Sequence, residues 1–187
     1  MSGKNQLSAL LIGPTDKTKI FRFGKIKEDE YETLKQEFGR VLAKHIHRVI
    51  IIPDEGIPLD IAKSYKENGG LRVIGYLPKG GCEELKRYFN YCDSLEEIDG
   101  GWSTLNTCLS LKGDVMIGFG LSPGTLTEIA YSAYHFRYLK RRIPILLYEK
   151  AISSRLQPEL EEEVDIRYFN TPSELDVILE KIGLVGK

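Results

Sequence analysis

The sequence predicts an α/β protein: three layers, with a mostly parallel sheet between two layers of helices. Short β-rich runs alternate with amphipathic stretches along the chain, which is the pattern of strand–helix–strand units. The first five runs are separated by stretches long enough to cross over to a parallel neighbour. The length of 187 residues fits one domain covering residues 1–187.

Six apolar runs are predicted as strands: Leu7–Gly13, Val49–Ile52, Leu71–Leu77, Asp114–Phe119, Ile143–Tyr148 and Ile166–Phe169. Helices are predicted over Glu28–Lys44, Leu59–Asn68, Glu83–Tyr91, Ser103–Leu111, Thr125–Tyr138 and Ser153–Glu163, and from Pro172 to the end. Thr171 and Glu174 have the spacing of a capping box for the last helix. Within Ser153–Glu163, Pro158 is expected to restart or kink the helix. Ile20–Phe23 is read as a short strand or a loop, and Asp93–Gly101 as an acidic irregular segment.

The expected strand order is 3-2-1-4-5-6, with the chain crossing over between the third and fourth strands. In such sheets ligands bind outside the carboxyl ends of the strands, where the order reverses. The turn that begins at Gly13 should therefore lie beside the turn from Gly120 to Gly124. The turn from Pro53 to Gly56 should open at the same edge.

The most informative stretch runs from Gly113 to Ala130, where a buried strand leads through a Gly-rich turn into a helix. Backbone N–H groups at such a helix start point toward an anion. The turn also supplies the hydroxyls of Ser122 and Thr125 and, one helical turn further on, the carboxyl group of Glu128. Turn chemistry and helix-dipole complementation account for the same residues without any ligand.

This stretch resembles a known signature, because Ser-x-Gly-Thr-x-x-Glu after a strand is similar to the Pro-Gly-Gly-x-Gly-Thr-x-x-Glu of the lonely-guy family. That family, within the SLOG superfamily, includes cytokinin-activating nucleotide phosphoribohydrolases and molybdenum-cofactor carrier proteins. The resemblance implies a Rossmann-like nucleotide-binding fold. It extends to Val73–Pro78, which is similar to the family's Val-Ile-Gly-x-x-Pro strand, and to Asn106, which lies eight residues before Asp114 as in the family.

Three departures from the family bear on function. The family's Arg, expected to help cleave the N-glycosidic bond, would fall on Leu105, and leucine neither carries charge nor donates hydrogen bonds. The Gly-rich turn after the second strand has become Pro53–Gly56, where only Gly56 matches and two carboxylates would repel a phosphate. In the central loop, Pro123 removes one N–H donor.

Two functions stay open. In the first, the Gly120–Thr125 loop binds a nucleotide or another phosphorylated small molecule without efficient catalysis. In the second, the protein is a nucleoside 5′-monophosphate phosphoribohydrolase in which Glu128 is catalytic and Arg22, Arg72 or Arg137 replaces the lost Arg. The residues expected to contact the ligand are Gly13, Gly56, Asn106, Gly120, Ser122, Gly124 and Thr125.

No cofactor is required by these readings. Asp54, Glu55 and Glu128, with Asp16 as a further candidate, have the oxygen ligands that suit Mg²⁺, but a solvated acidic turn is the favoured interpretation. His135 is expected on the surface of the central helix. Trp102 is expected either to stack on a base or to pack against the sheet.

The partners follow from charge and from the aromatic pattern. A net charge of −1 gives no electrostatic case for nucleic acid or an anionic membrane as the main partner. No segment is long enough to span a bilayer, and three cysteines without CxxC spacing read as cytoplasmic thiols. Tyr131, Tyr134 and Tyr138 form one stripe on the central helix, which either packs in the core or makes a homodimer face.

Overall fold

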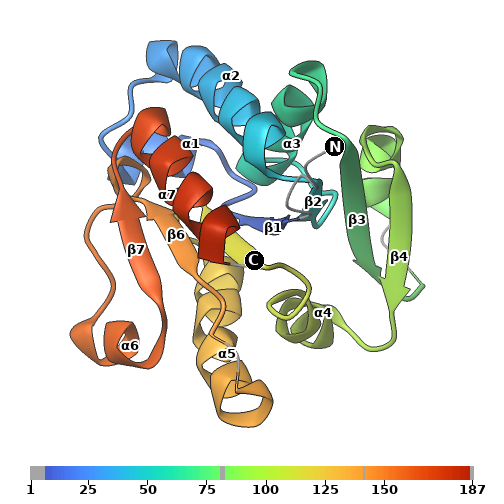
Figure 1. The fold of residues 1–187 in the computed structure, drawn as a ribbon. Helices are drawn as coiled ribbons and strands as arrows, with labels where there is room; N and C mark the ends of the chain where they lie inside the picture. The colour runs from blue at the N-terminus through green and yellow to red at the C-terminus, as the bar shows by residue number, and fades with distance from the viewer. Residues whose placement is uncertain (1–6, 81–82, 141, 186–187) are drawn as a thin grey trace.

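The computed structural model describes residues 7–80, 83–140 and 142–185. It is a three-layer αβα sandwich around one seven-stranded parallel sheet (Figure 1). The strands are β1 (Ser8–Ile12), β2 (Arg48–Ile51), β3 (Arg72–Pro78), β4 (Ser94–Ile98), β5 (Val115–Gly118), β6 (Ile145–Tyr148) and β7 (Ile166–Phe169). Their order across the sheet is β4-β3-β2-β1-β5-β6-β7.

The helices are α1 (Thr18–Phe23), α2 (Glu28–His45), α3 (Ile57–Glu67), α4 (Trp102–Leu109), α5 (Pro123–Leu139), α6 (Pro158–Glu163) and α7 (Pro172–Val185). Two 3₁₀ segments, η1 (Glu83–Tyr91) and η2 (Glu149–Ala151), lie in the connections. Among the described residues, no helix is both long and apolar enough to cross a membrane.

Alternating side chains of the strands pack into two separate hydrophobic cores, one on each face of the sheet. In β1, Ala9 and Leu11 face the layer formed by α2, α3 and α7, while Leu10 and Ile12 face the layer that contains α4 and α5. Figure 1 shows α2 and α7 on one side of the sheet and α4 and α5 on the other. Because every strand is buried on both faces except at the edges, the strand sequences are apolar throughout, as a parallel sheet requires.

The order predicted for six strands is confirmed, and the prediction missed the seventh. Residues 94–98, read as irregular, form β4, which pairs with β3 from Ser94 to Ile98. Both faces of β4 are largely exposed, so its Glu-rich sequence carries no apolar alternation. Charged side chains on an edge strand also discourage pairing with a second chain.

One other local prediction was wrong, and one was right in part. Ile20–Phe23 is part of helix α1, which is preceded by Asp16, whose carboxylate accepts hydrogen bonds from the backbone N–H of Thr18 at 3.0 Å and from its hydroxyl at 2.7 Å. The segment from Ser153 to Glu163 is helical only from Pro158, where the sequence allowed the helix to restart, because proline is favoured in the first helical turn and not in the interior.

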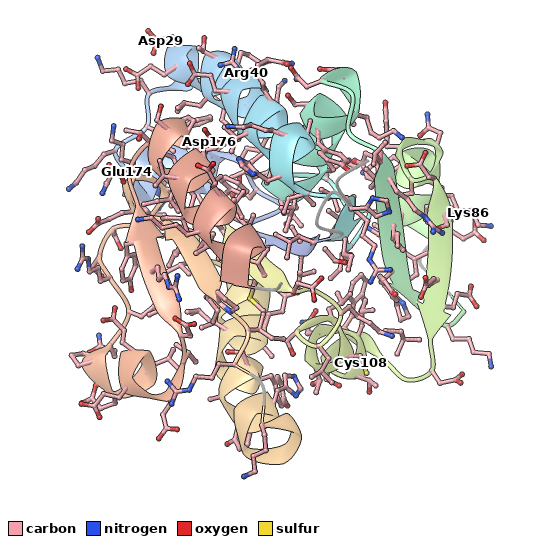
Figure 2. All side chains as sticks on the ribbon, in the orientation of Figure 1. Asp29, Arg40, Lys86, Cys108, Glu174 and Asp176 are labelled. Atoms are coloured by element: carbon pink, nitrogen blue, oxygen red, sulfur yellow. The ribbon has the colours of Figure 1, made fainter. Side chains whose placement is uncertain are left out.

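The C-terminal helix is capped as predicted and tied to α2. Thr171 Oγ1 accepts from the N–H of Glu174 at 3.1 Å, and the Glu174 carboxylate accepts from the N–H of Asn170 at 2.7 Å. Asp176 lies on α7 (Figure 2) and accepts from Lys44 at 2.9 Å and from His45 at 2.5 Å, which joins the two helices.

Candidate functional site

A pocket of about 310 Å³ lies at the carboxyl edge of the sheet, between the ends of β1 and β5. These two strands are neighbours, and the N–H of Phe119 donates to the carbonyl of Ile12 at 3.0 Å, so the turns that follow them start side by side. The lining residues are Leu11, Ile12, Gly13, Thr15, Lys19, Ile52, Asp54, Glu55, Pro58, Trp102, Asn106, Ser122, Pro123, Gly124, Thr125 and Glu128.

Ser122 caps the start of α5 from within the pocket. Its Oγ accepts from the N–H of Thr125 at 3.2 Å and lies 2.9 Å from the Thr125 hydroxyl, and its carbonyl accepts from the N–H of Leu126 at 2.9 Å. Pro123 has no N–H. Within the described chain, the N–H of Gly124 donates to no other group. Gly124 is therefore the open backbone donor at the positive end of α5.

Glu128 lies one helical turn beyond Gly124. Its side chain is 6% exposed, lines the pocket, and forms no hydrogen bond or ion pair with any described residue. Burial raises the pKa of this carboxyl from 4.5 to about 8, because the charged form loses most of its hydration without gaining a partner among the described residues. Glu128 is therefore largely a neutral carboxylic acid at pH 7.

Helix α4 forms the facing wall of the pocket. Trp102 and Asn106 are one turn apart and both line it; Trp102, the only tryptophan of the chain, is 42% exposed. A Cβ placed on Gly124 would lie 3.8 Å from Nδ2 of Asn106 and 3.8 Å from Oγ of Ser122. The missing side chain at Gly124 thus keeps a gap open between an amide, a hydroxyl and a free backbone N–H.

Of the eight site residues that the sequence suggests, six line this pocket: Gly13, Asn106, Ser122, Gly124, Thr125 and Glu128. Gly56 and Gly120 do not. Both have positive φ, at 120° and 114°, and both allow close backbone packing: a Cβ on Gly56 would lie 2.5 Å from the Pro14 carbonyl oxygen, and one on Gly120 would lie 3.0 Å from Cδ of Pro14. Their role is to bring the turns together.

The rim of the pocket is charged. Lys19 is the one cation among the described lining residues, and Asp54 and Glu55 supply two carboxylates. The Asp54 carboxylate accepts from the N–H of Glu55 at 2.7 Å, and Arg87 on η1 lies 3.7 Å from Glu55. The sequence analysis did not include Lys19 and Thr15 among the site residues. Both follow the first strand closely, so they lie at the edge of the sheet where a ligand was expected.

Leu105 lies where the resemblance places an arginine, and its side chain is fully buried in the core on the α4 face, outside the pocket lining. The two described alternatives also lie elsewhere: Arg22 faces the Phe23 ring on α1, and Arg72 donates to Ser94 at 3.1 Å. The side chain of Arg137 lies outside the described residues. No described arginine lines the pocket.

His135 was expected on the surface and is buried, 8% exposed, with Nε2 2.5 Å from Oγ of Ser110. Three of the carboxylates considered for Mg²⁺, those of Asp54, Glu55 and Glu128, line the pocket, but among the described residues no three His, Cys, Asp or Glu side chains are placed to hold a metal ion. Tyr131 and Tyr134 have ring centroids 6.1 Å apart and Tyr134 is 53% exposed, while the Tyr138 side chain lies outside the described residues.

Comparison with solved structures gives the same fold. The molybdenum cofactor carrier protein of Chlamydomonas reinhardtii matches with a TM-score of 0.66 and 19% identity, over 97% of this chain and 99% of that one. The molybdenum cofactor binding protein of Rippkaea orientalis matches with a TM-score of 0.63 and 16% identity, over 95% of this chain and 97% of that one. DNA processing protein A of Helicobacter pylori matches with a TM-score of 0.58 and 14% identity, over 95% of this chain and 81% of that one; its structure is described for its mode of binding single-stranded DNA.

At these identities the likeness establishes the fold. No curated protein matches the sequence significantly. The model of the SLOG cluster4 family matches residues 10–175, which include every strand except the first two residues of β1, and the whole of the pocket lining. The chain therefore belongs to the SLOG cluster4 family.

Proposed function

We propose that the pocket binds a nucleotide or another phosphorylated small molecule at the Gly120–Thr125 loop, without efficient catalysis. The observation that carries this proposal is the open N–H of Gly124 at the start of the 17-residue helix α5, inside a pocket of about 310 Å³. A backbone donor at the positive end of a helix favours an anionic group. The neutral form of Glu128 leaves that end without a competing charge.

The phosphate would rest between α4 and α5. Gly124 would donate its N–H, Asn106 its amide N–H, and Lys19 would supply the cation. The N–H of Thr125 already donates to Ser122, and Pro123 has none, so this site has fewer backbone donors than a glycine-rich loop. We therefore expect modest affinity, with much of the binding supplied by the rest of the ligand.

The remainder of the ligand would face Trp102, Ile52 and Pro58. An indole ring that is 42% exposed at a pocket wall is suited to stacking on a planar base. The molybdenum cofactor, for which the Chlamydomonas and Rippkaea proteins are named, is a further candidate ligand for this pocket.

Inefficient hydrolysis is expected because no described arginine reaches the pocket. Cleavage of an N-glycosidic bond develops positive charge on the sugar, which an ionised carboxylate stabilises. A Glu128 carboxyl whose pKa is about 8 is mostly neutral at pH 7 and poorly suited to that role.

The alternative is a phosphoribohydrolase that uses Glu128. The observation in its favour is that a buried, unpartnered carboxyl group faces the pocket, as a general acid would. Incubation with adenosine 5′-monophosphate (AMP) followed by chromatography for free adenine tests it. Release that is abolished in Glu128→Gln would support the enzyme; no release, with binding retained, would support the carrier.

Binding itself can be measured through Trp102, because the only tryptophan of the chain lies on the pocket wall. We expect saturable changes in its fluorescence on titration with AMP and with cytidine 5′-monophosphate (CMP). The absence of any change with AMP, CMP and inorganic phosphate up to millimolar concentration, confirmed by an unshifted melting temperature, would refute the proposal.

A further inference from the structure

The carboxyl group of Glu128 is an uncommon feature of the pocket. It is 6% exposed and has no partner among the described residues, although its helix neighbour Thr125 is hydrogen-bonded to Ser122. An ionised carboxylate buried without a donor or a counter-ion is costly, whereas the neutral acid is much less so. The geometry thus favours a form of Glu128 that carries a proton and needs an acceptor for it.

The position of Glu128 relative to Gly124 decides how this proton responds to a ligand. The two residues are four apart on α5, so they lie on one face of the helix, about 6 Å apart along its axis. A phosphate held at the N–H of Gly124 would therefore sit close to the Glu128 carboxyl. Two negative charges at that separation in a buried site repel, and the protonated form of Glu128 becomes more favourable still.

The other charges around the pocket do not offset this repulsion. Asp54 and Glu55 face it from the turn after β2, and Lys19 faces it from α1. An ionised Glu128 would be a third carboxylate against one ammonium group. On α5 itself the described titratable side chains that follow Glu128 are the phenols of Tyr131 and Tyr134 and the imidazole of His135, which is two turns further on and bonded to Ser110. The lining residues of α4, Trp102 and Asn106, carry no charge.

We propose that Glu128 binds the ligand as a neutral carboxylic acid, donating its O–H to a ligand oxygen, so that at alkaline pH, where this carboxyl is ionised in the free protein, binding of an anionic ligand is coupled to uptake of up to one proton. This inference rests on the proposed function and specifies its ligand: an anion with an acceptor oxygen one helical turn from the Gly124 N–H. A cationic group at that position would instead favour the ionised form of Glu128, so its binding would release a proton and not take one up.

The test is the pH dependence of the dissociation constant of AMP and of CMP, followed through Trp102 fluorescence between pH 7.5 and 9.5. The phosphate of both nucleotides is a dianion over this range, and neither base titrates in it. We expect affinity to fall with pH, approaching tenfold per pH unit at the alkaline end, where a bound ligand must bring a proton to a carboxyl group that is ionised in the free protein.

Two variants isolate the Glu128 carboxyl. Glu128→Gln keeps a donor of similar shape that cannot ionise, so it should bind at pH 7.5 within a few-fold of the native protein and lose the pH dependence. Glu162→Gln, an exposed change on α6 far from the pocket lining, should behave as the native protein does. Calorimetry at pH 9 in buffers of different ionisation enthalpy should show uptake that approaches one proton per site.

Each outcome separates this inference from the function on which it rests. Affinity that is flat with pH, or that rises with pH, would overturn the inference while leaving the binding function intact. A pH dependence that is the same in Glu128→Gln would assign it to other groups and also overturn the inference. Absence of binding by both nucleotides at every pH would overturn the proposed nucleotide function and this inference with it.

Discussion

Ser110 Oγ lies 2.5 Å from Nε2 of His135, and this hydrogen bond joins the C-terminal end of α4 to the C-terminal half of α5. Both side chains are buried, and Ser110 also donates toward the carbonyl of Thr107 at 2.7 Å. The pocket lies between the N-terminal halves of the same two helices. The Ser110–His135 pair therefore fixes the spacing of the walls that carry Asn106 and Gly124.

Ser110→Ala is expected to lower the free energy of unfolding by about 1–3 kcal/mol, because it removes the hydroxyl that is hydrogen-bonded to a buried imidazole. We also expect weaker AMP binding, since α4 can then shift against α5. Urea denaturation and Trp102 fluorescence titration measure the two effects. The control is Ser103→Ala on the exposed side of α4, which should change neither; equal effects in both variants would contradict the role given to the pair.

The same pair should make stability sensitive to mild acid. Burial lowers the pKa of His135 below its ordinary value of 6.5, so below about pH 6.5 the unfolded chain takes up a proton that the folded chain resists. The contribution of His135 to the free energy of unfolding should therefore fall from pH 7.5 to pH 5.5, opposite to the trend expected of Glu128. By urea denaturation, the native protein should lose stability relative to His135→Gln, which cannot be protonated, between these two pH values; a constant difference between the two proteins would refute the assignment.

Replacing Leu105 by the arginine of the lonely-guy family should not restore hydrolysis. Leu105 is fully buried in the core on the α4 face, so Leu105→Arg forces a charged group into an apolar site without a partner. We expect a loss of about 3–5 kcal/mol in urea denaturation and no gain in release of adenine from AMP. Leu71→Arg, at a leucine that is 60% exposed, is the matched control and should be nearly neutral.

Strands buried on both faces were readable from the sequence because they are apolar throughout. The order of β3, β2, β1, β5, β6 and β7 followed from the chain pattern and the resemblance. Edge strand β4 was missed because its Glu-rich side chains face solvent on both sides, which leaves no periodicity to detect. Pattern-based prediction works where burial imposes a pattern.

The candidate site could be predicted in part for the same reason. The turns after β1 and β5 were placed correctly by topology, so the lining by Gly13, Ser122 and Gly124 followed. What the sequence did not reveal was which side of a helix each residue faces: Leu105 turns inward while Asn106 lines the pocket, and His135 is buried by a contact with Ser110 from a distant segment. Such contacts exist only in the folded chain.

Gly124→Ala should separate ligand binding from folding. A Cβ at this position meets nothing closer than 3.8 Å, so the fold should be kept, but the methyl group would occupy the gap between the amide of Asn106 and the hydroxyl of Ser122. We expect at least a tenfold loss of AMP affinity by Trp102 fluorescence, with little change in the free energy of unfolding. Gly101→Ala, whose Cβ would have no atom within 4 Å, should leave both unchanged.

The burial of Glu128 should also be visible in the pH dependence of the stability of the ligand-free protein. The pKa of this carboxyl is about 8 in the folded chain and near 4.5 when exposed, so between these pH values the folded protein holds a proton that the unfolded chain has lost. Stability from this group therefore falls as pH rises through that window, by at most about 1.4 kcal/mol per pH unit, and is lost in full above about pH 8.

Glu128→Gln removes this dependence, because the amide has no proton to lose. The variant should gain stability relative to the native protein as pH rises from 5 to 8, and the difference should then level off. Urea denaturation at intervals of half a pH unit measures it, with Glu162→Gln as a control for a carboxyl in water, which should track the native curve. A constant difference from pH 5 to 9 would mean that Glu128 is ionised, and hydrated through the pocket, in the folded protein.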